Sequence, residues 1–218
     1  MELLMSDVFE RIVDMAGEVD ESPLRRADLD SCPLRQVEFW LKEAVEAGLP
    51  APNAMTLGTV DPKGQPSGRT VLLKAIVDGG FLFFTNYESR KGRDIEANAL
   101  VSLLIPWLPL YRQVIVEGVA EKVSREVSQI YFASRPTTSQ AAARASRQSE
   151  PVADRAELDH AFRQAENEKD VSEVPPHWGG YRVIPSKIEF WQGRSKRLHD
   201  RLVFRRNADG WTIERLSP

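Results

Sequence analysis

The stretch Ile188–Arg201 combines cationic and aromatic side chains in a pattern that suits an anionic, aromatic ligand. It opens with the two-residue alternation of a strand, and after a turn Arg197, His199 and Arg201 recur at a spacing of two residues. If that part is extended, these three side chains point the same way, close to Trp191. Guanidinium groups bind phosphate in two-pronged contacts and stack on rings. A charged edge strand that only prevents aggregation would have a similar composition, so both interpretations stay open here.

Arg90 and Lys91 fall in the first turn of a helix that the sequence predicts over residues 89–98, with Ser89 as its cap. Cations at this position oppose the helix dipole, so helix stability does not explain them. Free backbone N–H groups together with two cations would make a good phosphate cradle. The alternative is a pair of exposed charges that the helix tolerates at small cost.

Two further cations, Arg69 and Lys74, bracket an apolar run in a strand predicted over residues 69–76. Their odd separation places them on opposite faces of a regular strand, so they need not bind the same anion.

A third polar group is spaced four residues apart and consists of Tyr131, Arg135 and Ser139. We expect Pro136 to kink the chain and to leave Ser139 on a loop. Two separate anion sites in a chain without excess positive charge predict two phosphorylated small molecules, such as a cofactor and a substrate.

The elements that must position these residues are mostly strands. An amphipathic helix begins at Pro33 and ends at Gly48, and further helical sequence covers residues 124–168. Within it, the small and polar stretch 137–149 would serve as the rim of a ligand site. Short strands joined by tight turns favour an antiparallel barrel or sandwich. The strands are expected at residues 55–60, 69–76, 81–85, 101–105, 113–119, 181–184, 188–191, 202–205 and 211–216.

Composition limits the class of protein. The net charge of -3 gives no electrostatic case for binding nucleic acid or an anionic membrane, and no apolar run is long enough to span a bilayer. The N-terminal residues are acidic where a signal peptide is basic, and the single cysteine, Cys32, fits a reducing compartment. We therefore expect a cytoplasmic protein with one domain over residues 31–218, preceded by a weakly patterned and mobile segment, residues 1–30.

Several common catalytic motifs are absent from the sequence, among them the dinucleotide-binding and nucleotide-phosphate glycine loops and the hydrolase nucleophile motif. Three histidines and one cysteine make a zinc site a poor hypothesis, so no metal is expected.

Seven motifs resemble the pyridoxamine 5′-phosphate oxidase family, and they occur in family order from about Leu34 to the C-terminus. They are R-T-V-L-L-K (69–74), F-F-T-N-Y-E-S-R-K-G (83–92), P-W-L-P-L-Y-R-Q-V (106–114), S-R-P-T-T-S-Q (134–140), S-R-Q-S (146–149), W-G-G-Y-R-V (178–183) and E-F-W-Q-G-R-S-K-R-L-H-D-R (189–201).

The resemblance implies a mainly β fold with flanking helices, an FMN-binding split β-barrel of antiparallel Greek-key type that forms a homodimer. It implies a flavin site built from Arg69, Thr70, Val71, Leu72, Leu73, Lys74, Phe84, Thr85, Arg90, Lys91, Gln113, Gln148, Ser149, Trp191 and Arg201. Some of these contacts would come from the partner subunit. The substrate phosphate would be held by Lys74, Tyr131, Arg135 and Ser139, and the substrate ring by the catalytic pair Arg197 and His199.

The implied reaction is a two-electron oxidation of pyridoxamine or pyridoxine 5′-phosphate to pyridoxal 5′-phosphate, with hydride passing to flavin N5 and O2 reoxidising the flavin to give H2O2. The protein's share is positioning and electrostatics. Arg197 would orient the substrate, and His199 is a natural group to assist proton movement, because an imidazole can both accept and donate a proton.

The sequence departs from the family pattern in two places, both around the substrate pocket. The segment 16–24 lacks the arginine and tyrosine that fold over the substrate, and Ala142-Ala143-Arg144 replaces the usual G-A-W. A related flavin oxidase of phenazine biosynthesis, acting on a dihydrophenazine carboxylate, is therefore an alternative, favoured by the stretch 145–154 but not by the complete phosphate-binding set. A flavin-binding split barrel without oxidase activity is a third possibility, and the intact R-L-H-D-R segment argues against it.

Overall fold

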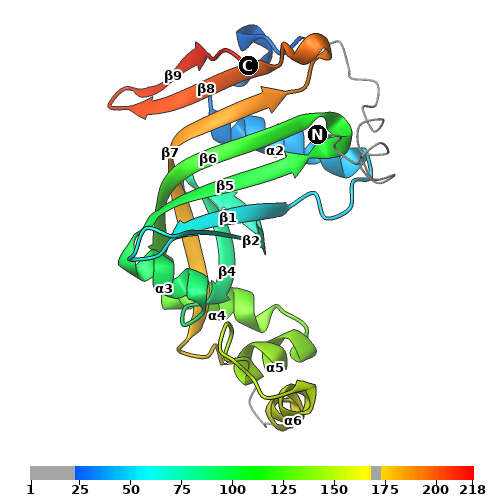
Figure 1. The fold of residues 1–218 in the computed structure, drawn as a ribbon, viewed down its shortest axis with the longest axis vertical. Helices are drawn as coiled ribbons and strands as arrows, with labels where there is room; N and C mark the ends of the chain where they lie inside the picture. Colours follow the sequence, from blue (N-terminus) through cyan, green and yellow to red (C-terminus); the bar gives the residue numbers. More distant parts are fainter. Residues whose placement is uncertain (1–22, 168–172) are drawn as a thin grey trace, which may run out of the picture.

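The computed structural model describes residues 23–167 and 173–218. Their strands form one curled antiparallel sheet of nine strands, in the order β2-β1-β5-β6-β7-β4-β3, with β8 and β9 added beside β7 (Figure 1). The prediction of an antiparallel barrel-like fold is confirmed. The strands are β1 (Ala54–Val60), β2 (Pro66–Leu72), β3 (Ala75–Val77), β4 (Gly80–Asn86), β5 (Leu100–Trp107), β6 (Arg112–Lys122), β7 (Trp178–Gln192), β8 (Asp200–Asn207) and β9 (Gly210–Arg215).

Strand β7 organises the sheet because it contacts three others. It is 15 residues long and pairs with β4 through its first half, with β6 along most of its length and with β8 through its second half. The sequence predicted two strands here, residues 181–184 and 188–191. They are one strand instead, because a register shift opposite Glu117 and Gly118 lets the chain pass Pro185 without leaving the sheet.

The strand predicted over residues 69–76 is in fact broken at Leu73 and Lys74. The Leu73 N–H donates to the Asn53 carbonyl beside β1, whereas the Lys74 N–H donates to the Leu82 carbonyl of β4. The chain therefore changes partner strands at this point. The odd-spacing argument for Arg69 and Lys74 assumed a regular strand and does not apply.

Helix α2 (Pro33–Glu46) begins at Pro33 as predicted and covers the barrel core with Val37, Trp40 and Ala44, all of them buried. The chain leaves it at Gly48, whose φ of +70° is costly for any residue with a Cβ. Helix α3 (Arg90–Ala97) follows β4. Helices α4 (Arg125–Ala133), α5 (Thr137–Ala145) and α6 (Arg155–Glu166) gather at the end of the sheet opposite β8 and β9 (Figure 1).

Most of the predicted N-terminal segment, residues 1–30, lies outside the described residues. Of the part described, Pro23 to Asp30, Leu24 is buried. Its N–H donates to Asp200 Oδ2 at 3.0 Å and its carbonyl accepts from Arg215 Nη2 at 2.7 Å. This short stretch, which includes the 3-10 turn η1 (Arg26–Asp28), is thus held against β8 and β9.

Candidate functional site

A cavity of about 670 Å³ lies between strands β2 and β4 and helices α4 and α5. It is the place where the fold brings most of the predicted site residues together. The predicted residues that line it are Thr70, Val71, Leu72, Lys74, Phe84, Thr85, Lys91, Tyr131, Arg135, Ser139 and Gln148. Helix α5 supplies one wall of this cavity, so residues 137–149, predicted as a ligand rim, do lie along it.

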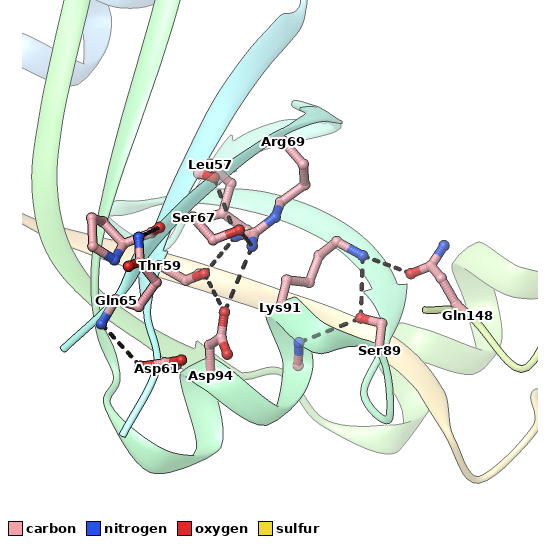
Figure 2. Close-up of polar contacts among 12 residues, drawn as sticks. Leu57, Thr59, Asp61, Gln65, Ser67, Arg69, Ser89, Lys91, Asp94 and Gln148 are labelled. Carbon is pink, nitrogen blue, oxygen red and sulfur yellow. Dashed lines mark hydrogen bonds and ion pairs between the residues drawn. The ribbon is translucent and has the colours of Figure 1, made fainter. Parts of the chain in front are cut away.

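One side of the cavity is the N-terminus of α3. Ser89 caps this helix as predicted, accepting a hydrogen bond from the Gly92 N–H. Lys91 Nζ donates to Ser89 Oγ at 3.1 Å and to Gln148 Oε1 at 2.6 Å (Figure 2). Burial, and secondarily the positive charge of Arg69, lowers the pKa of Lys91 to about 8. A buried cation at a helix N-terminus is a strong attractor for a phosphate. Arg90, predicted as its partner, is exposed and does not line the cavity.

Arg69 lies behind this cradle rather than in the cavity lining. Its guanidinium donates from Nη1 to Thr59 Oγ1 at 2.6 Å and from Nη2 to Ser67 Oγ at 2.8 Å (Figure 2). Thr59 in turn donates to Asp94 Oδ2 at 2.6 Å, and the same oxygen is 3.6 Å from Arg69 Nη2. This buried network ties the β1–β2 hairpin to α3 and so fixes the helix that carries Lys91.

The opposite wall carries the second cation group. Arg135 follows α4, with its Nη1 buried and without a hydrogen-bond acceptor among the described residues. Burial lowers the pKa of Arg135, although a guanidinium still remains charged. Ser139 lies in α5 and not on a loop, because Pro136 caps a new helix instead of only ending the previous one. Tyr131 and Lys74 complete the group, with Lys74 Nζ 5.8 Å from the Tyr131 ring centre.

The remaining predicted residues lie elsewhere. Leu73 is in the core, and Ser149 is exposed beside Gln148 without lining the cavity. Gln113 and Trp191 are paired across β6 and β7, near the end of β7 that lies away from the cavity.

The prediction that Arg197, His199 and Arg201 lie on one face of an extended chain is wrong. Arg197 lies in the 3-10 turn η3 (Ser195–Arg197) with a φ of 59°, which breaks the extended chain. The His199 ring lies 4.8 Å from the Trp191 ring, and its Nδ1 accepts the Arg194 N–H at 3.1 Å. Arg201 forms a two-pronged pair with the buried carboxylate of Glu189, at 2.7 and 3.1 Å.

Two family models match this chain. Residues 41–169 match the family model described as pyridoxamine 5′-phosphate oxidase. Residues 178–218 match the one described as the pyridoxine 5′-phosphate oxidase C-terminal dimerisation region. The chain belongs to the pyridoxamine 5′-phosphate oxidase family.

Curated members of the family are similar over nearly the whole chain. The pyridoxine/pyridoxamine 5′-phosphate oxidase of Ralstonia pickettii is 51% identical over 211 residues, which is 95% of this chain and 99% of that protein. The enzyme of the same name from Rubrobacter xylanophilus is 51% identical over 210 residues, covering 94% and 97%. Among solved structures, PhzG from Burkholderia lata in complex with tetrahydrophenazine-1-carboxylic acid has a TM-score of 0.87 at 30% identity, covering 93% of this chain and 100% of PhzG.

The departure from the family's G-A-W motif falls on the cavity wall. Ala142 and Ala143 line the cavity, while Arg144 turns away to the Glu173 carbonyl and the Phe132 ring. Sequence reasoning did not assign every lining residue to the site, and the largest side chain among those missed is Trp178, which begins β7. The motif that contains it was recognised, but nothing in the local pattern distinguishes this tryptophan from a core residue.

The network around Asp94 gives a prediction about stability. Asp94→Ala is expected to lower the free energy of unfolding by about 3 kcal/mol, because it leaves the half-buried Arg69 without its carboxylate. Urea denaturation followed by circular dichroism measures the change. The matched control is Glu96→Ala on the same helix, where the pair with Lys122 is exposed and the expected loss is under about 1 kcal/mol. Equal losses in the two variants would show that the network does not hold α3.

Within the described residues, no helix is long and apolar enough to cross a membrane. Nor does that part of the chain contain a group of three or more histidine, cysteine or acidic side chains placed to hold a metal ion.

Proposed function

We propose that this protein is an FMN-dependent oxidase that converts pyridoxamine and pyridoxine 5′-phosphates to pyridoxal 5′-phosphate, with O2 as the electron acceptor and H2O2 as the second product. One observation carries the proposal: a single cavity holds two separate cationic groups, Lys91 on one wall and Arg135 with Lys74 on another. Two phosphorylated molecules, a cofactor and a substrate, would satisfy both. The names of the family relatives agree with this assignment.

The residues on the Lys91 side fit FMN. Lys91 and the first turn of α3 would hold the FMN phosphate, with Arg90 adding charge from outside, and Thr85 and Gln148 already contact each other there at 3.4 Å. Residues 70–72 line the cavity beside them and would lie along the flavin ring. FMN, when bound, supplies a two-electron acceptor that substrate reduces and O2 reoxidises.

The residues on the Arg135 side fit the phosphate of the substrate. Arg135 offers a buried donor without an acceptor, Tyr131 and Ser139 offer hydroxyl groups, and Lys74 adds a second charge. These groups would fix the phosphate end of the substrate, so that its C4′ is held in one orientation toward the flavin.

The catalytic pair Arg197 and His199 would come from the partner subunit of a homodimer. Strand β7 begins at the cavity with Trp178 and carries Trp191 near its other end, roughly 40 Å further along the strand at about 3.3 Å per residue. Figure 1 shows β8 and β9 at the end of the sheet opposite α4 and α5. A single subunit therefore cannot bring Arg197 and His199 to its own cavity. The match of residues 178–218 to a dimerisation region supports a second subunit that does so.

In that dimer the two residues would have separate tasks. Arg197 would hold the substrate ring in place. Because His199 Nδ1 accepts the Arg194 N–H, the neutral ring carries its proton on Nε2, which is therefore the atom that can exchange a proton with substrate. Trp191, Gln113 and Arg201 lie on the same part of β6, β7 and β8 and would complete the flavin site from the partner.

A second candidate is the oxidation of a dihydrophenazine carboxylate, supported by the TM-score of 0.87 to PhzG in complex with tetrahydrophenazine-1-carboxylic acid. Such a substrate has no phosphate for Arg135, Lys74, Tyr131 and Ser139 to bind. The identity to PhzG is 30%, against 51% to the pyridoxine/pyridoxamine 5′-phosphate oxidase of Ralstonia pickettii. Both observations favour the phosphorylated vitamin.

The test is flavin reduction without oxygen. Purified protein loaded with FMN is mixed anaerobically with pyridoxine or pyridoxamine 5′-phosphate and its absorbance near the flavin maximum is followed. We expect rapid bleaching, then recovery with release of peroxide when air is admitted. Bleaching by a reduced phenazine carboxylate alone would establish the second candidate, and a yellow protein that no substrate bleaches would be a flavin binder without oxidase activity.

A further inference from the structure

Three aromatic rings form a parallel stack under the substrate-phosphate residues. Phe84 of β4 lies 4.0 Å from Tyr131 of α4 and 5.4 Å from Trp178 of β7, with interplanar angles of 16° and 11°. The rings of Tyr131 and Trp178 are 6.2 Å apart and inclined by 5°. Stacked pairs of this kind stabilise the fold by more than their buried apolar area alone would, and they hold the rings in fixed orientations.

The stack also holds the guanidinium of Arg135. Arg135 Cζ lies 4.8 Å from the centre of the Trp178 ring and 5.6 Å from that of Phe132. Phe132 is fully buried and meets Trp178 edge-on at 5.0 Å. A guanidinium that lies over a tryptophan face is attracted to the ring. Its N–H groups point outward from the edge of the guanidinium and can still donate hydrogen bonds to an anion. Because Nη1 is buried without a hydrogen-bond partner among the described residues, the rings of Trp178 and Phe132 are the contacts that orient this end of the guanidinium.

The backbone beneath the stack is built to keep it in place. Gly180 faces Phe84 across β4 and β7, and a Cβ at Gly180 would come within 2.8 Å of the Phe84 ring. A larger residue there would push the ring away from Tyr131. On the other side, Arg125 donates to the carbonyls of Pro175 and Trp178, which fixes the start of β7.

From these contacts we infer that Trp178 is a positioning residue for substrate binding: its ring holds Arg135 and, through Phe84, Tyr131 in the geometry that receives the substrate phosphate. The inference rests on the proposed function for the identity of the substrate. It assigns Trp178 no contact with the reacting atoms. Trp178 should therefore affect the affinity for the phosphate end and leave the chemical step nearly unchanged.

The experiment compares Trp178→Leu and Trp178→Phe in FMN-loaded protein. Trp178→Leu is expected to raise the KM for pyridoxine 5′-phosphate about tenfold with kcat within about threefold of wild type, since the cation–π contact with Arg135 and the ring contacts with Phe84, Tyr131 and Phe132 are lost. Trp178→Phe keeps a flat ring and is expected to restore most of the affinity. KM for unphosphorylated pyridoxine should be the same in all three proteins.

A matched control is Trp211→Leu, which removes another arginine–tryptophan contact, that of Arg206 at 5.8 Å on β8 and β9, where neither residue lines the cavity of its own subunit. It should leave KM unchanged. A wild-type KM in Trp178→Leu, or equal losses for phosphorylated and unphosphorylated substrates, would overturn the inference. If Trp178→Leu does not fold, Trp178→Phe decides, because it must still raise the KM by about twofold to threefold for the phosphate ester alone.

The outcome is separable from that of the proposed function. If the wild type oxidises no B6 phosphate ester, the proposed function fails, and inorganic phosphate then serves as the probe. Binding of phosphate to the FMN-loaded wild type, measured by titration calorimetry, should weaken about tenfold in Trp178→Leu. Unchanged phosphate binding in that variant would end the inference as well.

Discussion

Arg135→Ala is expected to lower kcat/KM for pyridoxine 5′-phosphate by about a hundredfold or more, since a buried charge pair that loses one partner costs about 2–5 kcal/mol. The guanidinium lies on the cavity wall with Nη1 buried and unpaired among the described residues, so the substrate phosphate would supply its acceptor. Burial lowers the pKa of Arg135, as expected for a charge partly removed from water. Most of the loss should therefore fall on KM. Steady-state peroxide production measures it.

Arg135→Lys separates charge from shape. Lysine keeps the charge but lacks the flat fork that lies over Trp178 and Phe132, so we expect it to recover only part of the loss. Unphosphorylated pyridoxine is the internal control, because it has no phosphate for residue 135 to bind and neither variant should change its turnover. If both substrates lost activity in parallel, Arg135 would act on the fold or on the flavin and not on the substrate phosphate.

The parts of this site that local chemistry determines could be predicted from the sequence. Ser89 is a typical helix cap, and cations in the first turn after it do not stabilise the helix, so the sequence alone makes Lys91 a candidate anion ligand. The four-residue spacing of Tyr131, Arg135 and Ser139 likewise indicated one polar group, and all three line the cavity. Such signals survive folding because they depend on neighbours in the chain.

The parts that depend on distant partners could not be predicted in this way. The break at Leu73 and Lys74 exists because the chain changes its hydrogen-bond partner there from the start of β1 to β4. The turn at Arg197 is formed by Lys196 and Arg197, which both have positive φ angles. Trp178 becomes part of the site only when β7 meets β4 and α4. Periodicity in the sequence does not indicate these contacts. The resemblance to a family, in contrast, named Arg197 and His199 as site residues, although within one subunit they lie far from the cavity.

The binding of FMN should weaken as pH rises through about 8, and Lys91→Met should remove that dependence together with most of the affinity. Lys91 in the free protein has a pKa lowered to about 8, first by burial and then by Arg69. A bound phosphate favours the charged form and raises this pKa. The lysine's contribution is therefore complete below pH 8 and declines above it, by up to about tenfold in affinity for each pH unit.

Lys91→Met is expected to raise the Kd for FMN about thirtyfold at pH 7, the value of a charge-assisted hydrogen bond to phosphate. Flavin fluorescence quenching between pH 7 and 9.5 measures Kd for both proteins, and riboflavin, which lacks the phosphate, should show neither the mutational loss nor the pH dependence. The flavin-free variant should unfold at an equal or higher urea concentration than wild type at pH 7, because a buried charge has been replaced by an apolar chain of similar length. A loss of FMN binding with unimpaired stability would place Lys91 at the phosphate. If the pH dependence instead persisted in Lys91→Met, another group would be responsible for it, and the α3 cradle would not be where the phosphate binds.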